Sequence, residues 1–175
     1  AAVEIGSCFG CGRSEVRRAY QRALENLAEY NACLRQGALA RDIADDWPLK
    51  RGSKRKESGG KKNINIAVVG HCYNIYDSYV NMDMLKKLKN MGVNIITTEM
   101  VDEEDINASV KGLHKKMFWN FGRFAVGAVN HLLRKGNIDG ILYIMSFGCG
   151  IDSFVCDIIE RRIRREGSTP FMVLT

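Results

Sequence analysis

The segment Ile138-Asp139-Gly140-Ile141-Leu142-Tyr143-Ile144-Met145-Ser146-Phe147-Gly148-Cys149-Gly150-Ile151-Asp152-Ser153 decides the fold class of this 175-residue chain. It begins with an apolar run, residues 138–145, which is typical of a buried strand. A loop with two glycines follows, and residues 152–165 then show the pattern of an amphipathic helix. A strand that leads through a short loop into a helix is the repeating unit of parallel sheets.

The same alternation extends over residues 63–175. Apolar, β-branched runs predict strands at 64–69, 93–97, 138–145 and 171–174. Helices are predicted between them, at 77–91, from 102 onward, at 119–135 and at 152–165. In the first of these, the inner face is expected to carry Met82, Leu85, Leu88 and Met91. The sequence therefore predicts an α/β fold, a parallel sheet of about four strands with helices on both faces.

The region before residue 63 has a different character. Residues 1–48 are predicted to form an N-terminal helical segment, whose main helix is capped by Ser14 and ends near Gly37. Residues 49–62 are rich in Lys, Arg, Gly and Ser, and they are interpreted as a basic, flexible linker to the domain at 63–175. Most of the formal net charge of +6 lies in this linker, so the charge does not indicate a nucleic-acid partner.

Several classes of protein are disfavoured by the sequence. No apolar run approaches the roughly 20 residues that a membrane span needs. No basic flank with an apolar segment marks the start as a signal peptide, so a cytoplasmic protein with reduced thiols is expected. A P-loop, a G-x-G-x-x-G fingerprint after a strand and an H-E-x-x-H motif are missing from the printed sequence. The chain also starts without Met and ends on a predicted strand, which suggests a piece of a longer protein, truncated at its C-terminus.

Two strand-end loops carry most of the side chains that could bind a ligand or take part in a reaction. Gly70–Asp77 contains His71, Cys72, Tyr73 and Asn74, and it either lines a site or caps the next helix through Asp77. In the loop 146–153, glycines flank Cys149 and leave its sulfur uncrowded, close to the start of a helix that Asp152 is expected to cap. Because both loops follow strands in the same sense, their side chains are expected to meet at one sheet edge. The candidate site residues in these loops are His71, Tyr73, Asn74, Asp77, Ser146, Gly148, Gly150, Asp152 and Ser153.

Other candidates lie outside these loops. Arg123 follows an aromatic cluster, residues 117–121, and either clamps an anionic group or belongs to an aromatic helix start. Cys8 and Cys11 form a C-x-x-C pair between glycines, which is half of a metal site or an ordered turn. Cys33 and Cys156 lie in amphipathic helices and are interpreted as core residues.

Three motifs together resemble a known family. They are Gly70-His71-x-Tyr73-Asn74-x-x-Asp77, Phe118-Trp119-x-x-Gly122-Arg123 and Ser146-Phe147-Gly148-Cys149-Gly150-x-Asp152-Ser153. In this order they are similar to the acyl-CoA dehydratase activase-related proteins, relatives of the 2-hydroxyacyl-CoA dehydratase subunits. The resemblance covers residues 63–175 and, more loosely, the helix at 15–37.

The resemblance implies a fold, a cofactor and partners. Dehydratase relatives hold iron–sulfur clusters through cysteines on strand-end loops of flavodoxin-like domains, so a flavodoxin- or Rossmann-like sheet is expected. Cys149 would then be a thiolate ligand, the one ligand role that the resemblance implies in this chain. Cys72 departs from the family's pattern but lies in the same region, and it is a second candidate metal ligand. The remaining ligands would come from Cys8 and Cys11, from other sequence or from a second subunit, since a cluster takes roughly four thiolates. The implied partner is an ATP-dependent activator protein or a CoA-thioester enzyme, and a homo-oligomer is compatible with it.

Three functions remain open on this basis. The leading hypothesis is an iron–sulfur-associated domain that serves low-potential electron transfer or activation of a CoA-thioester enzyme. The alternative is a non-catalytic module that holds a nucleotide or CoA phosphate on helix N-termini. A thiol-nucleophile enzyme comes third, because no His–carboxylate pair can be assigned to Cys149 from the sequence.

Overall fold

The computed structural model describes residues 2–45, 64–113, 117–167 and 169–175. It divides the chain into two compact units, residues 1–47 and 48–175. We describe each unit by itself. The predicted linker at 49–62 lies outside the described residues.

The N-terminal unit consists of helices α1 (Ala2–Cys8), α2 (Arg13–Arg35) and α3 (Ala40–Asp45). The prediction that Ser14 caps α2 was wrong, because Gly12 occupies that position and its N–H donates to Glu15 Oε2 at 2.8 Å. Glu15 thus reaches back from the first turn to the start of the helix. At the other end the expectation for Gly37 agrees with the structure, since its φ of +84° follows the last helical turn.

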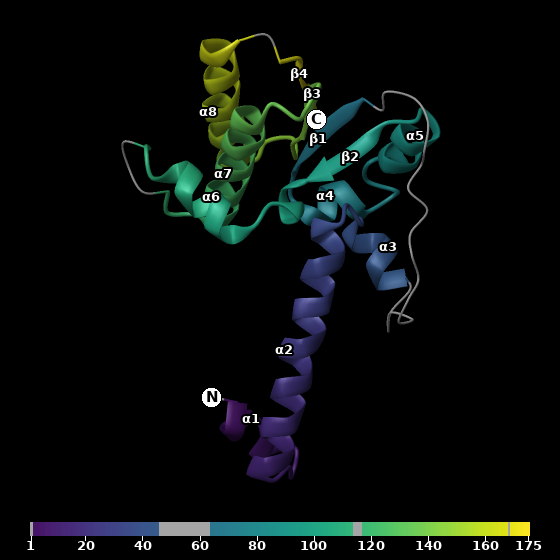
Figure 1. The fold of residues 1–175 in the computed structure, drawn as a ribbon, viewed down its shortest axis with the longest axis vertical. Coiled ribbons are helices and arrows are strands. Elements are labelled where there is room, and N and C mark those ends of the chain that lie inside the picture. The colour runs from purple at the N-terminus through teal and green to yellow at the C-terminus, as the bar shows by residue number, and fades with distance from the viewer. Residues whose placement is uncertain (1, 46–63, 114–116, 168) are drawn as a thin grey trace. The chain divides into compact units, whose positions relative to one another are not determined.

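The second unit is a doubly wound α/β layer structure (Figure 1). Its four strands are all parallel and lie in the order β2-β1-β3-β4, which confirms the predicted sheet. The elements in chain order are β1 (Asn65–Gly70), α4 (Cys72–Tyr76), α5 (Met84–Asn90), β2 (Asn94–Thr97), the 3-10 helix η1 (Thr98–Met100), α6 (Glu103–Val110), α7 (Asn120–Lys135), β3 (Gly140–Ile144), α8 (Gly150–Glu166) and β4 (Phe171–Leu174).

Helices cover both faces of the sheet, and this explains why β1 and β3 are continuous apolar segments in the sequence. Helices α7 and α8 cover one face of the sheet, where Val129 and Ile159 pack against Ala67 and Tyr143. Helices α4 and α5 lie on the other face, where Ile75 and Val68 are fully buried. Strands covered on both faces need apolar side chains in both directions.

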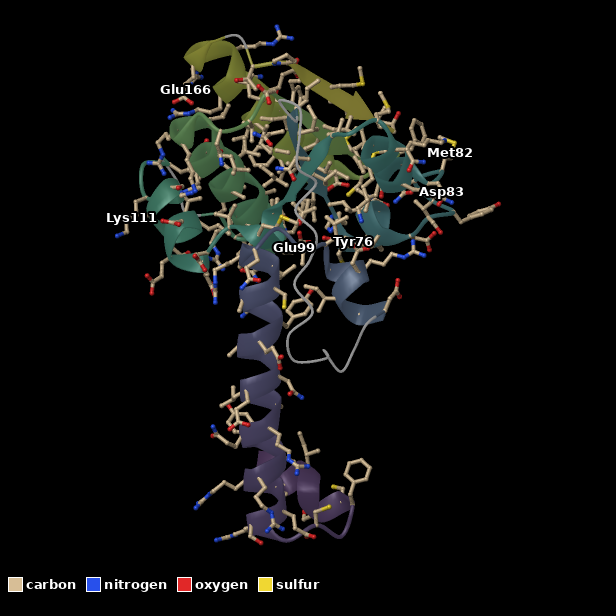
Figure 2. The ribbon with its side chains drawn as sticks, turned by 45° about the vertical axis from the view of Figure 1, so that its right-hand side comes forward. Tyr76, Met82, Asp83, Glu99, Lys111 and Glu166 are labelled. Carbon is tan, nitrogen blue, oxygen red and sulfur yellow. The ribbon has the colours of Figure 1, made fainter. Side chains whose placement is uncertain are left out.

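The chain between β1 and β2 differs most from the prediction. One helix was expected over residues 77–91, but the structure has the short α4 inside the predicted loop and a later helix, α5. Met82 and Asp83 between them have positive φ angles of 52° and 57°, which no helical residue adopts. Met82 and Met91 are therefore exposed instead of facing the core, and Met84 and Leu85 are buried. Figure 2 shows Met82 and Asp83 at the outer side of this unit.

The two helical cysteines differ in burial. Cys156 on α8 is buried, as predicted, whereas Cys33 on α2 is half-buried. Among the described helices, none combines the length and the apolar character that crossing a membrane requires.

Burial of Cys156 predicts a pH dependence of stability. Desolvation, helped by the carboxylates of Glu160, Asp157 and Asp152, raises the pKa of the Cys156 thiol from 9.0 to about 11. The folded state thus holds this proton more tightly than the unfolded state, and the resulting stability is lost as the pH rises from about 9 to about 11. We expect Cys156→Ala to flatten the fall in unfolding free energy over this interval, measured by urea titration. A Cys72→Ala control should keep the wild-type slope, and an equal slope in both variants would contradict the assignment.

Candidate functional site

The candidate site lies where β1 and β3 end side by side. Gly70, the last residue of β1, pairs with Ile144, the last residue of β3. The connection from β1 leads to β2 on one side, whereas the connection from β2 leads back across β1 to β3 on its other side. This change of direction makes the space beyond β1 and β3 the topological switch point, where open α/β sheets bind their ligands.

Gly70 allows the two strand ends to come together. A Cβ atom at this position would lie 2.6 Å from the backbone oxygen of Ile144. No side chain fits at that distance, so the close approach of β1 to β3 depends on glycine. His71 follows directly and is the N-cap of α4.

The loop after β3 forms a tight turn into α8. The Cys149 N–H donates to the Ser146 oxygen at 3.1 Å, and Gly148 between them has a φ of +75°. A positive φ at the third residue alone is the requirement of a type II turn. Cys149, not Asp152 as predicted, is the N-cap of α8. Both the backbone N–H and the hydroxyl of Ser153 donate to the Cys149 oxygen, at 3.0 and 2.9 Å.

Asp152 has an interior role that the sequence did not reveal. Its side chain is fully buried, and its Oδ2 accepts the Ser146 N–H at 3.2 Å. The carboxylate therefore turns back from α8 and fixes the preceding loop through this hydrogen bond. The hydroxyl of Tyr143, also fully buried, lies 3.5 Å from the Asp152 backbone oxygen. Burial, with the negative charge of Asp152 in second place, raises the pKa of Tyr143 far above its usual range, so the phenol stays neutral.

The second oxygen of Asp152 faces His71. Asp152 Oδ1 and His71 Nε2 are 3.2 Å apart, and this carboxylate oxygen has no aligned hydrogen bond within the described residues. The contact is thus an ion-pair distance rather than a linear hydrogen bond. A buried carboxylate beside Nε2 favours a proton on that nitrogen and leaves Nδ1 as the nitrogen that can act on a ligand.

Aromatic rings hold the imidazole in place. The ring of Phe121, at the start of α7, stacks on His71 with centroids 3.7 Å apart and an interplanar angle of 18°. The ring of Tyr73 is nearly parallel to it as well, at 5.1 Å and 12°. His71 therefore has one orientation, and its side chain remains 25% exposed.

A second contact joins the two loops. Asn74 is buried, and its Nδ2 donates to Ser146 Oγ at 2.9 Å. Together with the contact between His71 and Asp152, this bond connects the start of α4 to the turn before α8. These two contacts thus join four of the candidate residues across the two loops, His71, Asn74, Ser146 and Asp152, and a fifth, Tyr73, stacks on His71.

Other candidates have local roles in the structure. Asp77 Oδ1 accepts the N–H groups of Tyr79 and Val80, at 2.9 and 3.0 Å, so this carboxylate orders the turn after α4. Arg123 bonds to Glu103 and Asn107 on α6 and to Asn120, and its guanidinium lies over the Phe124 ring. Cys72 is exposed, and Cys149 is half-buried.

Two functional features were missed by sequence reasoning. Phe121 was noticed only as one of several aromatic residues, and the pairing of His71 with Asp152 was not assigned. The available signal was that His71 directly follows β1 and that Asp152 lies in the first turn of α8, the helix that follows β3. It becomes informative only when β1 and β3 are known to be neighbours.

The turn after β3 presents unpaired backbone donors. Among the described residues, no hydrogen-bond partner is found for the N–H groups of Phe147, Gly148, Gly150 and Ile151. Cβ atoms built at Gly148 and Gly150 would meet no atom within 4 Å, so the backbone there is open. Successive free N–H groups at the start of a helix form a favourable environment for an anion.

The described residues around Cys149 supply only part of the ligands that a metal cluster needs. Within residues 2–45, 64–113, 117–167 and 169–175, no group of three or more His, Cys, Asp or Glu side chains could hold a metal ion. An iron–sulfur cluster takes roughly four thiolates. The described residues around Cys149 therefore do not fit such a cluster by themselves.

Comparison with known proteins identifies a family model that matches residues 1–101, described as the CoA enzyme activase uncharacterised domain. The match covers the N-terminal unit and the α/β unit as far as η1, including the His71 loop, whereas the turn at 146–149 follows the matched region. No curated protein and no solved structure matches the chain.

Proposed function

The chain belongs to the family of the CoA enzyme activase uncharacterised domain, and from this premise we propose that its α/β unit binds a phosphate group of a nucleotide or of CoA. The ligand would lie beyond the ends of β1 and β3. In this proposal the unit is a non-catalytic binding module within a protein that activates a CoA-thioester enzyme. Its partner would be that enzyme or an ATP-dependent activator protein.

The observation that carries the proposal is the row of free N–H groups at the start of α8. Phe147, Gly148, Gly150 and Ile151 offer donors without partners in the described chain. These donors and the positive end of the helix dipole both favour a phosphate. The topological switch point of the sheet lies at the same place, and this supports the location of the ligand independently.

Both oxygens of the buried carboxylate face groups of the protein itself. Asp152 directs one oxygen to the Ser146 N–H and the other to His71, and its side chain is fully buried. His71 would then orient the ligand, and Asn74 would hold the turn through Ser146.

A second candidate function is favoured by Cys149. Its thiol is half-buried and stands at the start of α8, beside the open backbone of Gly148 and Gly150. In this version the unit is an iron–sulfur-associated domain in low-potential electron transfer, and Cys149, with Cys72, contributes ligands. Further thiolates would have to come from outside the described part of this unit.

One substitution tests the binding proposal with a matched control. Gly150 is the first residue of α8, where proline is tolerated and removes only the N–H group. Gly150→Pro should weaken the binding of ADP and CoA by about 10-fold or more, because a hydrogen bond to a charged group contributes about 1.5–3 kcal/mol. Gly150→Ala keeps the N–H and has open space for its Cβ, so its affinity should match the wild type. Isothermal titration calorimetry measures both.

A Cys149 variant separates the phosphate-binding module from the iron–sulfur-associated domain. Cys149→Ser should leave the affinity for ADP and CoA unchanged if the unit is a phosphate-binding module. In the iron–sulfur version, this variant would instead lose iron and sulfide, measured after anaerobic purification. Equal affinity of the Gly150→Pro and Gly150→Ala variants, or no binding of either ligand by the wild type, would refute the binding module.

A further inference from the structure

Of the two histidines in the described part of the chain, only His71 lies against a buried carboxylate. Its Nε2 is 3.2 Å from Asp152 Oδ1, and the Asp152 side chain is fully buried. The Nδ1 of His131 on α7 is 3.9 Å from Asp105 Oδ1, but the Asp105 side chain is 52% exposed. Water screens an exposed carboxylate, whereas a buried one acts strongly on its neighbour. His71 is therefore the histidine whose chemistry the fold controls.

Asp152 sets which nitrogen of His71 carries the proton. Its Oδ2 accepts the Ser146 N–H, but within the described residues its Oδ1 has no aligned hydrogen bond. A buried carboxylate oxygen without a donor is costly, so a proton on His71 Nε2 lowers the free energy of the pair. A neutral imidazole that is protonated on Nε2 has its free lone pair on Nδ1. Nδ1 is then the nucleophilic atom of the ring.

Two aromatic rings orient the imidazole without covering that lone pair. Phe121 and Tyr73 lie nearly parallel to the His71 ring, at centroid distances of 3.7 and 5.1 Å. Stacked rings contact the faces of the imidazole, whereas the Nδ1 lone pair lies in the plane of the ring and points outward from its edge. The side chain is also 25% exposed. The stacking therefore fixes the direction of the nucleophile and leaves the ring edge for a reacting group.

Asp152 also joins His71 to the start of α8. It lies in the first turn of this helix, and its Oδ2 holds the turn before the helix by a hydrogen bond. The N–H groups of Phe147, Gly148 and Gly150 there have no partner among the described residues. Donors of this kind stabilise the negative charge of a phosphoryl group during its transfer. One buried carboxylate thus brings a nucleophile and phosphate-binding donors to the same strand ends.

The geometry points to His71 as a phosphoryl acceptor, whose Nδ1 takes the terminal phosphoryl group of a nucleoside triphosphate. The Nδ1 lone pair forms the N–P bond while the bond from the γ-phosphorus to the bridging oxygen breaks. The nucleoside diphosphate leaves with that oxygen and the electron pair of the broken bond. The proton stays on Nε2, where the Asp152 carboxylate balances the positive charge that the ring gains. This reaction rests on the phosphate site proposed for α8 and goes beyond a non-catalytic binding module.

Incubation of the purified chain with [γ-³²P]ATP and Mg²⁺ tests the inference. We expect a protein-bound label that is lost in acid and kept in alkali, because a phosphoramidate is acid-labile and a phosphoserine is not. ³¹P NMR should place the phosphorus on Nδ1. His71→Gln should abolish the label and keep the wild-type circular dichroism, since the glutamine amide can still donate to Asp152. His131→Asn, the matched control, should be labelled as the wild type is.

A variant of Asp152 tests its role in positioning the imidazole. Asp152→Asn removes the charge that keeps the proton on Nε2, so labelling should slow by at least about 10-fold. The remaining label should be divided between the two ring nitrogens, a change that a loss of stability alone does not produce. Label found only on Nδ1 in this variant would overturn the assignment of the tautomer to Asp152, and with it the inference.

The outcomes also separate this reaction from the binding site on which it rests. ADP binding by the wild type, measured by calorimetry, without any acid-labile label would overturn the phosphoryl acceptor and leave the phosphate-binding module standing. Absence of both ADP binding and label would refute both proposals. Label kept by His71→Gln, or phosphorus found on Nε2 of the wild type, would overturn the inference as well.

Discussion

Replacing Asp152 with alanine is expected to lower the free energy of unfolding of the α/β unit by about 2–4 kcal/mol. The carboxylate is the acceptor of the Ser146 N–H and the ion-pair partner of His71, and its own side chain is fully buried. Its removal leaves an N–H without a partner and frees the imidazole from the turn. Urea denaturation, followed by the circular dichroism of the α/β unit, measures the loss.

Asp152→Asn is the matched control for this prediction. The amide oxygen can still accept the Ser146 N–H, so this hydrogen bond is kept and only the charge beside His71 is lost. We therefore expect a smaller loss of stability than with alanine. A double-mutant cycle with His71→Ala then isolates the coupling between the two side chains. An alanine variant as stable as the wild type would show that the hydrogen bond from Ser146 to Asp152 does not stabilise the turn.

Gly70→Ala is expected to cost about 2–3 kcal/mol, because its methyl group cannot be placed without separating β1 from β3. The new Cβ would lie 2.6 Å from the Ile144 backbone oxygen. Backbone atoms in a paired strand cannot move aside as the end of a flexible side chain can. The strand ends would have to part, and with them His71 and the turn at Ser146.

Gly112→Ala provides the comparison for this glycine. A Cβ at Gly112 meets no atom within 4 Å, so the change should alter stability by no more than about 0.5 kcal/mol. Thermal or urea unfolding of both variants measures the difference. If Gly70→Ala unfolded at the same denaturant concentration as Gly112→Ala, the close approach of β1 and β3 would not depend on glycine.

The fold could be predicted because its signals are local. The strand predicted at 171–174 is β4 in the structure, and the helix predicted at 119–135 is α7 with one residue fewer. Buried strands need apolar residues in unbroken runs, and a glycine marks the end of α7 at Gly136, with a φ of +64°. The motifs of the two strand-end loops also indicated the family, which the match over residues 1–101 confirms.

The errors fall where a local pattern competes with tertiary geometry. Met82 fits a helical repeat in sequence, but the chain turns through positive φ angles at Met82 and Asp83, and α5 begins only at Met84. Asp152 is a good capping residue in isolation. The N–H of Ser146 and the nearby His71 draw its side chain inward instead.

The sequence by itself determined the four strands and most of the helices between them, and therefore that two polar loops stand at one edge of a parallel sheet. Only the tertiary structure decided that β1 and β3 are neighbours, since strand order depends on how the connecting helices pack on the two faces. That order sets His71 beside Asp152 and Asn74 beside Ser146, residues 81 and 72 positions apart in the chain. Contacts across such distances arise from packing of the whole unit, which no local pattern of residues encodes.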